Sequence, residues 1–488
     1  MDINLIDWLF VGAYIVGIFV IAYYSSREQH ESELKTQEQI AQEKFLANKS
    51  LTFFESMCSI IATEVSALTF IGVPAQAFKT DFSIIQMYLG TVVARFVIAT
   101  VIVPRVYNKG ITIYGVMTDE GKGNLSGQRL MACFYTGAKV VAIGVRLFTG
   151  SILVSQFFNM SVPVALVSIV TLTLLYTQFG GLKAVVRIDI IQLCIFILGG
   201  VLAHYYIPVT AGESWGEMMS AASAAGKTTF FNWSDPTSII LGLLGGCLFD
   251  ISTHGVDQDF AQRMTANENL RGGQRAIFFS SFLSIGVAAI FLGVGALLWA
   301  FYQKHPMPEV ASADYLFPHF IVHHFPTGLR GLMVAGVLSA TMSVLDSIIN
   351  ALGATFYNDI LPNRNYDKNM KLYSILDSIV IVGMILAVAL LSTKFDGLLM
   401  LGLRAQTWTG GALLALFVTK LVFPKYFPYQ LNAVSVFGTY VCGISAVYLN
   451  TFILEGNWNL NVYMNFLFSL SFLKIYSIIR PYRPKVKA

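Results

Sequence analysis

The segment from Leu332 to Phe356 is an apolar helix long enough to cross a bilayer, yet it carries a polar stripe. The members of this stripe are Ser339, Ser343, Asp346, Ser347 and Asn350. Each lies three or four residues from another member, which places them along one side of a helix. A carboxylate at membrane depth is costly unless it meets a cation, a hydrogen-bond partner or a water-filled cavity. The stripe therefore predicts a polar site inside the protein, where something is bound or moved.

The whole chain has the composition of a multi-pass membrane protein. Of its 488 residues, 55% are hydrophobic and only 12% are charged, and the mean hydropathy is +0.63, far from the average of soluble domains. At roughly 20 residues per crossing, the sequence predicts an all-α bundle of about 13 transmembrane helices. They begin near Leu5, Phe53, Phe82, Leu130, Val162, Ile188, Ile239, Ile277, Leu332, Leu372, Leu398, Ala433 and Leu460.

Positive charge predicts the orientation of the bundle. Most of the 32 Lys and Arg residues, Arg263 among them, fall in alternate connections, which would face the cytoplasm. We therefore expect a cell-membrane protein with its amino terminus outside and its carboxyl terminus in the cytoplasm. The apolar run from Leu5 to Tyr24 begins beside Asp7 and not beside cations, so it is expected to remain as a helix. The net charge of +4 reflects this topology, and no nucleic-acid partner is expected.

Patterns for catalysis and nucleotide binding are absent from the sequence, so an enzyme is not expected. The five cysteines fall in apolar spans, where they are expected to pack as small hydrophobic residues. His319, His323 and His324 have a spacing that could hold zinc on a helix. Without further ligands, a metal site at these histidines is not the expectation.

Two spans carry polar residues in their middle, which predicts interrupted helices. The second span does so over Ile61–Thr69, and the seventh does so over Gly245–Gly255. Paired interruptions in two halves of a chain are typical of secondary transporters built from inverted repeats, where freed carbonyls bind ions and substrate. The alternative is two ordinary kinked helices whose polar residues face neighbouring helices.

Five ordered motifs resemble the sodium:solute symporter family, which includes sodium-coupled sugar, sialic-acid, iodide and proline transporters. The motifs are Ala62–Phe70, Gly180–Gln192, Asp257–Arg263, Pro326–Gly331 and Ser339–Asn350. The resemblance extends from about Phe45 to about Leu421. Any single motif would be weak, but their order and their positions on the expected helices make the resemblance strong.

The resemblance implies one transmembrane domain, 1–488, with a leucine-transporter-like core of two inverted five-helix repeats. The first repeat would be 51–210 and the second 237–422. A leading helix and an inner loop (1–50) would precede them, and two trailing helices with a basic tail (430–488) would follow. The protein is expected to function as a monomer in the lipid bilayer.

The resemblance also implies a sodium site between the second and ninth spans. Its ligands would be the carbonyls of Ala62, Val65 and Ala340 and the hydroxyl of Ser343. Many members of the family have a further hydroxyl where this chain has Val344, so one ligand is missing.

Some members of the family hold a second sodium ion beside the first. Here its ligands would be Asp189, Ser343 and Ser347, with Asp346 nearby. One or two Na⁺ ions are therefore expected. The alternative for Asp189 is an ion pair with Arg187 or Lys183 near the inner boundary of its span.

A solute cavity is expected beside the sodium, against the two interrupted helices. The residues expected to border it are Glu64, Ser66, Thr69, Gln86, Asp250, Thr253 and His254. For a single hydroxyl, a hydrogen bond to the preceding turn of its own helix is the alternative. The two acids and the histidine are harder to explain in that way.

Arg146 and Arg404 are arginines within apolar spans, and each needs a carboxylate partner, an aqueous cavity or an anionic solute. Some acid-carrying members of the family have an arginine on the helix that matches Arg146, which favours a carboxylate such as a sugar acid. Pairing with Glu64 or Asp250 would instead leave a neutral solute such as a sugar. Some sugar carriers have a lysine at the position of Ser284, which argues mildly against that subgroup.

These features together predict a sodium-coupled symporter that imports a small polar organic solute by alternating access. A proton-coupled symporter of the same fold, using Glu64, Asp189 or Asp346, is one alternative. A membrane sensor that binds a solute without net transport is another.

Overall fold

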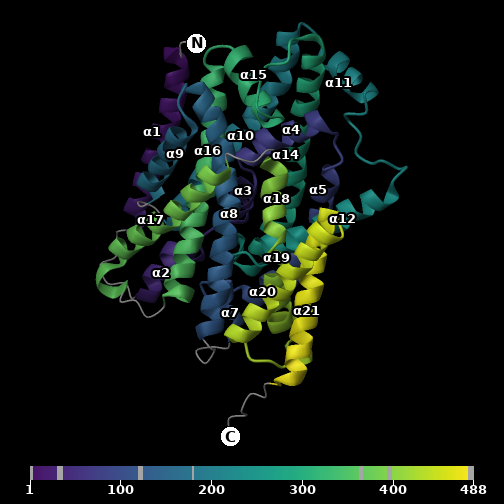
Figure 1. The fold of residues 1–488 in the computed structure, drawn as a ribbon. Helices are drawn as coiled ribbons and strands as arrows, with labels where there is room; N and C mark the ends of the chain where they lie inside the picture. The colour runs from purple at the N-terminus through teal and green to yellow at the C-terminus, as the bar shows by residue number, and fades with distance from the viewer. Residues whose placement is uncertain are drawn as a thin grey trace.

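The computed structural model describes residues 4–29, 37–118, 125–177, 181–361, 366–392 and 398–481. In these ranges the chain is helical and contains no β-strand, which confirms the predicted all-α class. Helix α1 (Leu5–Gln29) begins near one end of the bundle, and α21 (Asn461–Ile479) ends near the other (Figure 1). Ends at opposite sides of the bundle are expected when a chain crosses the membrane an odd number of times. The basic tail, residues 482–488, and the start of the Gly180–Gln192 motif lie outside the described ranges.

Ten helical runs in the described part of the chain are long and apolar enough to cross a membrane, or eleven if one bent pair counts as a span. The chain is therefore a multi-pass membrane protein. Six of these runs contain no wide turn: α1, α8 (Leu125–Phe157), α10 (Gly181–Ala211), α14 (Leu270–Lys304), α17 (Tyr366–Ser392) and α21. Four runs include wider turns: α5 (Ile85–Val97) continues to α6 (Val103–Val106), α12 (Pro236–Asp250) through Ile251–Gly255, α16 (Leu329–Thr355) through Phe356–Ile360, and α20 (Ala433–Tyr448) through Leu449–Ile453.

Three further predicted spans differ from this pattern. The second span is the bent pair, made of α3 (Phe53–Glu64) and the run from Leu68 through α4 (Val73–Lys79). The fifth is α9 (Val162–Thr177), which is apolar but short. The eleventh is divided into α18 (Leu398–Thr407) and α19 (Gly410–Phe417). The total of 13 spans therefore stays a prediction.

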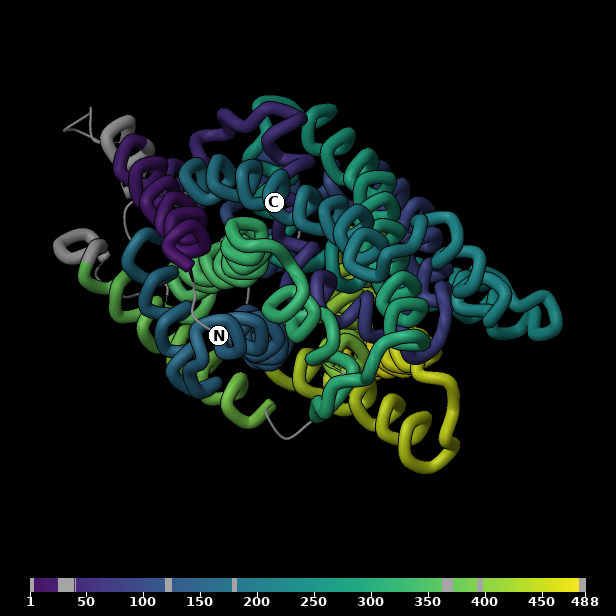
Figure 2. The backbone as a smooth tube through the Cα atoms, turned by 90° about the horizontal axis from the view of Figure 1, so that it is seen from above, coloured from purple at the N-terminus to yellow at the C-terminus, as the bar shows by residue number. Residues whose placement is uncertain are grey.

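The remaining helices are short and lie mainly towards the ends of the bundle. They are α2 (Gln37–Leu46), α7 (Ile113–Met117), α11 (Trp215–Ala224), α13 (Gln258–Thr265) and α15 (Leu316–His324). Seen from above, α1 and the pair α20–α21 lie at opposite edges of an elongated bundle (Figure 2).

Helix α16, which carries the polar stripe, is almost completely buried. It begins after Gly328, whose φ of 87° is a conformation that suits glycine. The carboxylate of Asp7 in α1 accepts hydrogen bonds from the backbone N–H groups of Gly328 (2.7 Å) and Gly331 (3.1 Å). Arg330 pairs with the same carboxylate at 3.0 Å. The acid at the start of the first helix thus caps the central one.

The interruption predicted in the second span is confirmed. Helix α3 ends at Glu64, and the chain bends by 59° before it becomes helical again. Val65 is extended, with ψ of 116°, so the helical ladder stops there. The Ile61 carbonyl still accepts from the Val65 N–H (2.8 Å), and the carbonyls after it in the last turn of α3 are left without helical partners.

The interruption predicted over Gly245–Gly255 corresponds to a wide turn, not to a break like that in the second span. Helix α12 runs through Gly245 and Gly246 to Asp250, the wide turn follows from Ile251 to Gly255, and the helical conformation ends at Val256 and Asp257. The glycines in this span serve close packing. A Cβ on Gly246 would lie 2.3 Å from the Met87 carbonyl oxygen on α5.

Gly90 of α5 makes the matching approach to α12. A Cβ there would lie 2.2 Å from the carbonyl oxygen of Leu243. Small residues of this kind let two membrane helices pack backbone to backbone. The contact holds α5 and α12 together beside the interior polar site.

We predict that Gly90→Ala destabilises the protein by about 1–3 kcal/mol, because the added methyl group must push the α5 and α12 backbones apart. Thermal unfolding of the purified protein in detergent would measure the change. Gly383→Ala on α17 is the control, since a Cβ there meets no atom within 4 Å. Equal melting temperatures for the two variants would contradict the proposed role of this crossing.

Candidate ion and solute site

Three helices bring candidate cation ligands together in the buried interior. The Ser343 hydroxyl of α16 lies 3.4 Å from the carbonyl oxygen of Ala62 and donates a hydrogen bond to Asp189 of α10. Ala62 belongs to the last turn of α3, where carbonyls lack helical partners. A carbonyl, a hydroxyl and a carboxylate therefore meet at one place, and a hard cation such as sodium binds oxygens of these kinds.

Val65 and Ala340, the other two expected carbonyl donors, are also buried. Val65 is the first residue beyond α3, at the bend. Ala340 lies within α16, which continues unbroken to Thr355. Its carbonyl already belongs to the helical ladder, so it has only a second lone pair to offer.

Ser347 and Asp346 extend the oxygen cluster by one turn along α16. The Ser347 hydroxyl lies 3.4 Å from that of Thr63 and accepts a 2.5 Å hydrogen bond from Arg263. Asp346 accepts a hydrogen bond from the Tyr176 hydroxyl of α9. Both residues are fully buried.

Arg263 of α13 belongs to this cluster although it is not among the site residues expected from the sequence. Its charge predicts a place on the inner surface, whereas the structure buries it completely. Its guanidinium lies 3.4 Å from Asp189 and 2.5 Å from Asp259, and its Nε donates to Ser59 at 2.7 Å. The ion pair of Asp189 is thus with Arg263, not with Arg187 or Lys183. The position of Arg263 in the Asp257–Arg263 motif is the signal that could have found it.

The cluster holds more negative than positive charge. Asp189, Asp259 and Asp346 are fully or almost fully buried, and within the described ranges only Arg263 forms ion pairs with any of them. Buried carboxylates without a countercharge are strongly unfavourable. A bound cation or a proton would remove this imbalance.

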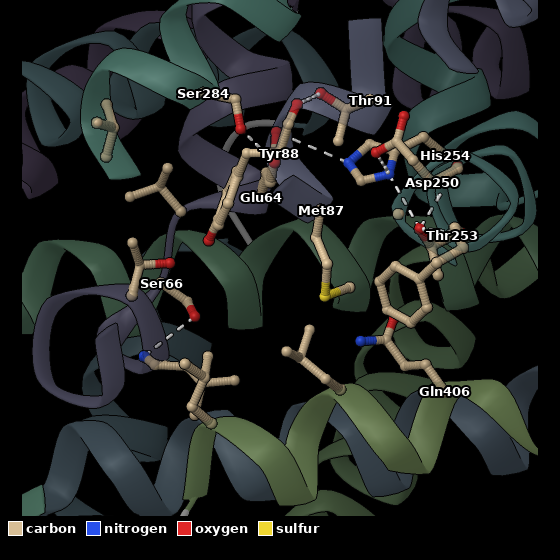
Figure 3. Close-up of a pocket in the computed structure, with 18 of the residues that line it drawn as sticks. Glu64, Ser66, Met87, Tyr88, Thr91, Asp250, Thr253, His254, Ser284 and Gln406 are labelled. Carbon is tan, nitrogen blue, oxygen red and sulfur yellow. Dashed lines mark hydrogen bonds and ion pairs between the residues drawn. The ribbon is translucent and has the colours of Figure 1, made fainter. Parts of the chain in front are cut away.

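A separate cavity of about 90 Å³ opens on the other side of the α3 bend. Seven predicted solute contacts line it: Glu64, Ser66, Thr69, Arg146, Asp250, Thr253 and His254. Five further polar residues line it without having been predicted to do so, namely Tyr88, Thr91, Lys139, Ser284 and Gln406. Figure 3 shows Glu64, Asp250 and His254 towards one side of the space, with Gln406 of α18 approaching from the opposite side.

Arg95 of α5, a residue whose partners could not be assigned from sequence, forms ion pairs with both acids of the cavity wall. Its Nη2 lies 2.6 Å from Glu64, and its Nε lies 3.3 Å from Asp250. Ser284 also donates to Glu64 at 2.5 Å, and His254 lies 2.9 Å from Asp250. Arg95 is completely buried. Its interactions with these groups are therefore shielded from water.

Arg146 of α8 also lines the cavity, and it differs from the other cations there. Within the described ranges its guanidinium forms no hydrogen bond or ion pair. Asp257, Asp259 and Glu64 attract its positive charge electrostatically but lie beyond ion-pair distance. Lys139, by contrast, pairs with Asp257. An arginine at this depth needs a partner, and the cavity is where that partner would lie.

The structure does not bring Gln86 to the cavity. Gln86 donates a 2.8 Å hydrogen bond to the Phe230 carbonyl and packs on Gly242, while Met87 and Tyr88 line the cavity. Successive residues of a helix differ in direction by about 100°. The predicted residue is therefore on the wrong face of α5.

Arg404 is misassigned for the same reason. Leu403 and Gln406 of α18 face the cavity, whereas Arg404 is exposed on the outer side of the helix, against α8. It is not a solute contact in this structure.

The three histidines of α15 do not form a metal site with other described residues. Partial burial and the charges of His323 and His324 lower the pKa of His319 to about 4. His319 is consequently neutral at physiological pH.

We predict that Arg95→Met destabilises the protein by about 3–5 kcal/mol, because Glu64 and Asp250 would be left buried without a cation. Adding Glu64→Gln and Asp250→Asn should restore much of the loss, as measured by thermal unfolding in detergent. Arg404→Met is the control and should change little, since Arg404 is exposed. A triple variant no more stable than the single variant would argue against this network.

Comparisons with known proteins agree with the architecture. Within the curated proteins, the sodium/sialic acid symporter SiaT of Proteus mirabilis is 24% identical over 74% of this chain and 72% of its own length. The sodium/glucose cotransporter of Vibrio parahaemolyticus is 24% identical over 73% of this chain and 69% of its own.

Two solved structures share the fold. A Na⁺-coupled sialic acid symporter in a substrate-bound outward-open state superimposes with a TM-score of 0.84, at 20% identity, over 99% of this chain and 100% of its own. Mhp1, a nucleobase-cation-symport-1 family transporter, gives a TM-score of 0.58 at 14% identity, covering 91% and 96%. A sequence model of the sodium:solute symporter family matches residues 45–427. The chain belongs to the sodium:solute symporter family.

Proposed function

We propose that this protein imports a small carboxylate-bearing solute together with sodium. The observation that carries the proposal is Arg146, which faces the cavity without a hydrogen bond or ion pair to any described residue. An arginine presents a planar fork of donors that fits a carboxylate. A bound carboxylate would give Arg146 the partner that it lacks.

The other charges of the cavity wall support an anionic solute over a cationic one. Glu64 and Asp250 are both held by Arg95, and Lys139 is held by Asp257. Glu64 and Asp250 therefore already contact a cation of the protein, whereas Arg146 has no described acid in contact. A polar rim of Ser66, Thr69, Tyr88 and Gln406 could hydrogen-bond hydroxyl or amide groups of the same solute.

Sodium coupling is supported by the bend of α3, which the two sites share. Ala62 contacts Ser343 in the ion cluster, whereas Glu64, Val65 and Ser66 line the solute cavity. A cation that binds the freed carbonyls would stabilise the bend in one conformation and so preorganise the cavity. The electrical part of the gradient supplies ~2.3 kcal/mol per charge per 100 mV.

The solutes of the similar proteins include both acids and neutral sugars. Sialic acid is a sugar acid, and glucose is neutral. A sodium-coupled monocarboxylate transporter of Mus musculus is 22% identical over 85% of this chain and 68% of its own. Arg146 is the feature of this chain that favours the acid.

Proton coupling is the second candidate, because Asp189, Asp259 and Asp346 outnumber their cation and Val344 lacks a hydroxyl. Counterflow in sodium-free buffer across a range of pH would separate it from sodium coupling. Uptake into proteoliposomes would separate either transporter from a sensor without net transport.

We predict that Arg146→Gln weakens binding of an acidic solute by at least tenfold, since it removes a charge-assisted bidentate contact. The readout is thermal stabilisation by a panel of sugar acids and monocarboxylates, each paired with its neutral amide or sugar counterpart. Wild-type protein should prefer the acid of each pair, and the variant should lose that preference. A wild-type preference for the neutral members would refute the assignment of Arg146.

We predict that Ser343→Ala and Asp189→Asn raise the sodium concentration needed for half-maximal uptake, because each removes an oxygen ligand. Initial rates of uptake against sodium concentration, at constant ionic strength, give this value. Thr341→Ala is a control on the same helix, since among the described residues the Thr341 hydroxyl hydrogen-bonds only to its own helix, at the Val337 carbonyl. Sodium dependence unchanged in both test variants would exclude this ion site.

A further inference from the structure

A second, larger hollow of about 690 Å³ lies between α8 and α18, outside the polar interior. Its walls are mainly apolar, with Phe134, Val141, Leu401 and Trp408 among them. Phe134 is held in place by stacking on Tyr440 of α20 at a centroid distance of 4.0 Å. We call this hollow the α8–α18 groove.

The groove exists because α8 has small residues where it meets the bilayer. Cys133, Gly137 and Val141 are exposed and follow one another at intervals of four residues, so they form one outward stripe. A Cβ on Gly137 would meet no atom within 4 Å. The space over Gly137 is therefore open to an external molecule.

Arg404 gives this apolar groove a positive charge. It lines the groove and is exposed, and in the ranges that the structure describes its guanidinium has no hydrogen bond or ion pair. The lining contains no Asp or Glu. A cation facing lipid hydrocarbon is unfavourable without a counter-ion, so the groove is complementary to an anion with an apolar tail.

The position of the groove along α8 suits a lipid of one leaflet. Helix α8 has 33 residues, about 50 Å at 1.5 Å per residue, and thus extends past a hydrocarbon core of about 30 Å. The groove runs from Leu130, near the amino end of α8, to Val141 at its middle. Arg129 is exposed directly before Leu130. Long arginine side chains reach from within the core towards the headgroup level.

We propose that the α8–α18 groove binds an anionic phospholipid. One acyl chain lies over Gly137 along the apolar wall, and the Arg404 side chain extends along the groove to the phosphate. This arginine should favour an anionic over a zwitterionic lipid about fivefold. This site is separate from the solute cavity and does not depend on the proposed function.

Quenching of Trp408 fluorescence by brominated lipid tests the proposal. The protein is reconstituted in phosphatidylcholine with increasing brominated phosphatidylglycerol, and in parallel with brominated phosphatidylcholine. The contribution of Trp408 is obtained by difference from Trp408→Phe. In wild-type protein, phosphatidylglycerol should quench Trp408 at severalfold lower mole fraction than phosphatidylcholine.

Two variants separate the role of the charge from the role of the open space. Arg404→Gln should remove most of the preference for phosphatidylglycerol, and Gly137→Leu should fill the groove and protect Trp408 from both lipids. Gly383→Leu, at an equally open glycine on α17, is the matched control and should leave quenching unchanged. Equal quenching by the two lipids in wild-type protein would overturn the anionic site. Trp408 quenching unaffected by Gly137→Leu would show that no lipid lies in the groove.

Discussion

Two buried guanidinium groups form ion pairs with the acids of the polar interior. Arg95 holds Glu64 and Asp250 together, and Arg263 holds Asp189 and Asp259. In a low-dielectric interior each of these acids would be very costly alone. Asp259 lies on the same helix as Arg263, but Glu64, Asp250 and Asp189 come from helices other than those of their arginines. The bundle must therefore close before these three acids are paired. The polar interior and the helix packing therefore depend on each other.

The bend of α3 lies between these two charge clusters and serves both. Its last turn leaves carbonyls without partners, and in a membrane such groups are tolerated only where protein or an ion satisfies them. On one side Ala62 approaches Ser343, and on the other Glu64 joins Arg95. A ligand bound on either side would change the stability of the same short stretch, and such a shared element would couple an ion to a solute.

Close helix crossings position these groups. Gly90 and Gly246 bring α5 and α12 into backbone contact, and this places Arg95 of α5 opposite Asp250 of α12. A glycine on the outer side of α8, Gly137, has a different effect. No described helix packs over Gly137, so a groove beside Arg404 remains open towards the bilayer. A glycine thus permits close packing where a second helix approaches and leaves a hollow where none does.

The sequence by itself determined the membrane class, the polar stripe of α16 and the bend after Glu64, because hydropathy, helical period and helix-breaking runs are local properties of the chain. It also indicated the family, through ordered motifs. Only the tertiary structure decided which charges meet and which helix faces point inward. Arg95 and Arg263 find acids 31 to 155 residues away and 74 residues away, and no local pattern specifies such a pairing. Polarity alone favours a cavity position for Gln86 and Arg404, yet a rotation of about 100° per residue puts their neighbours there instead.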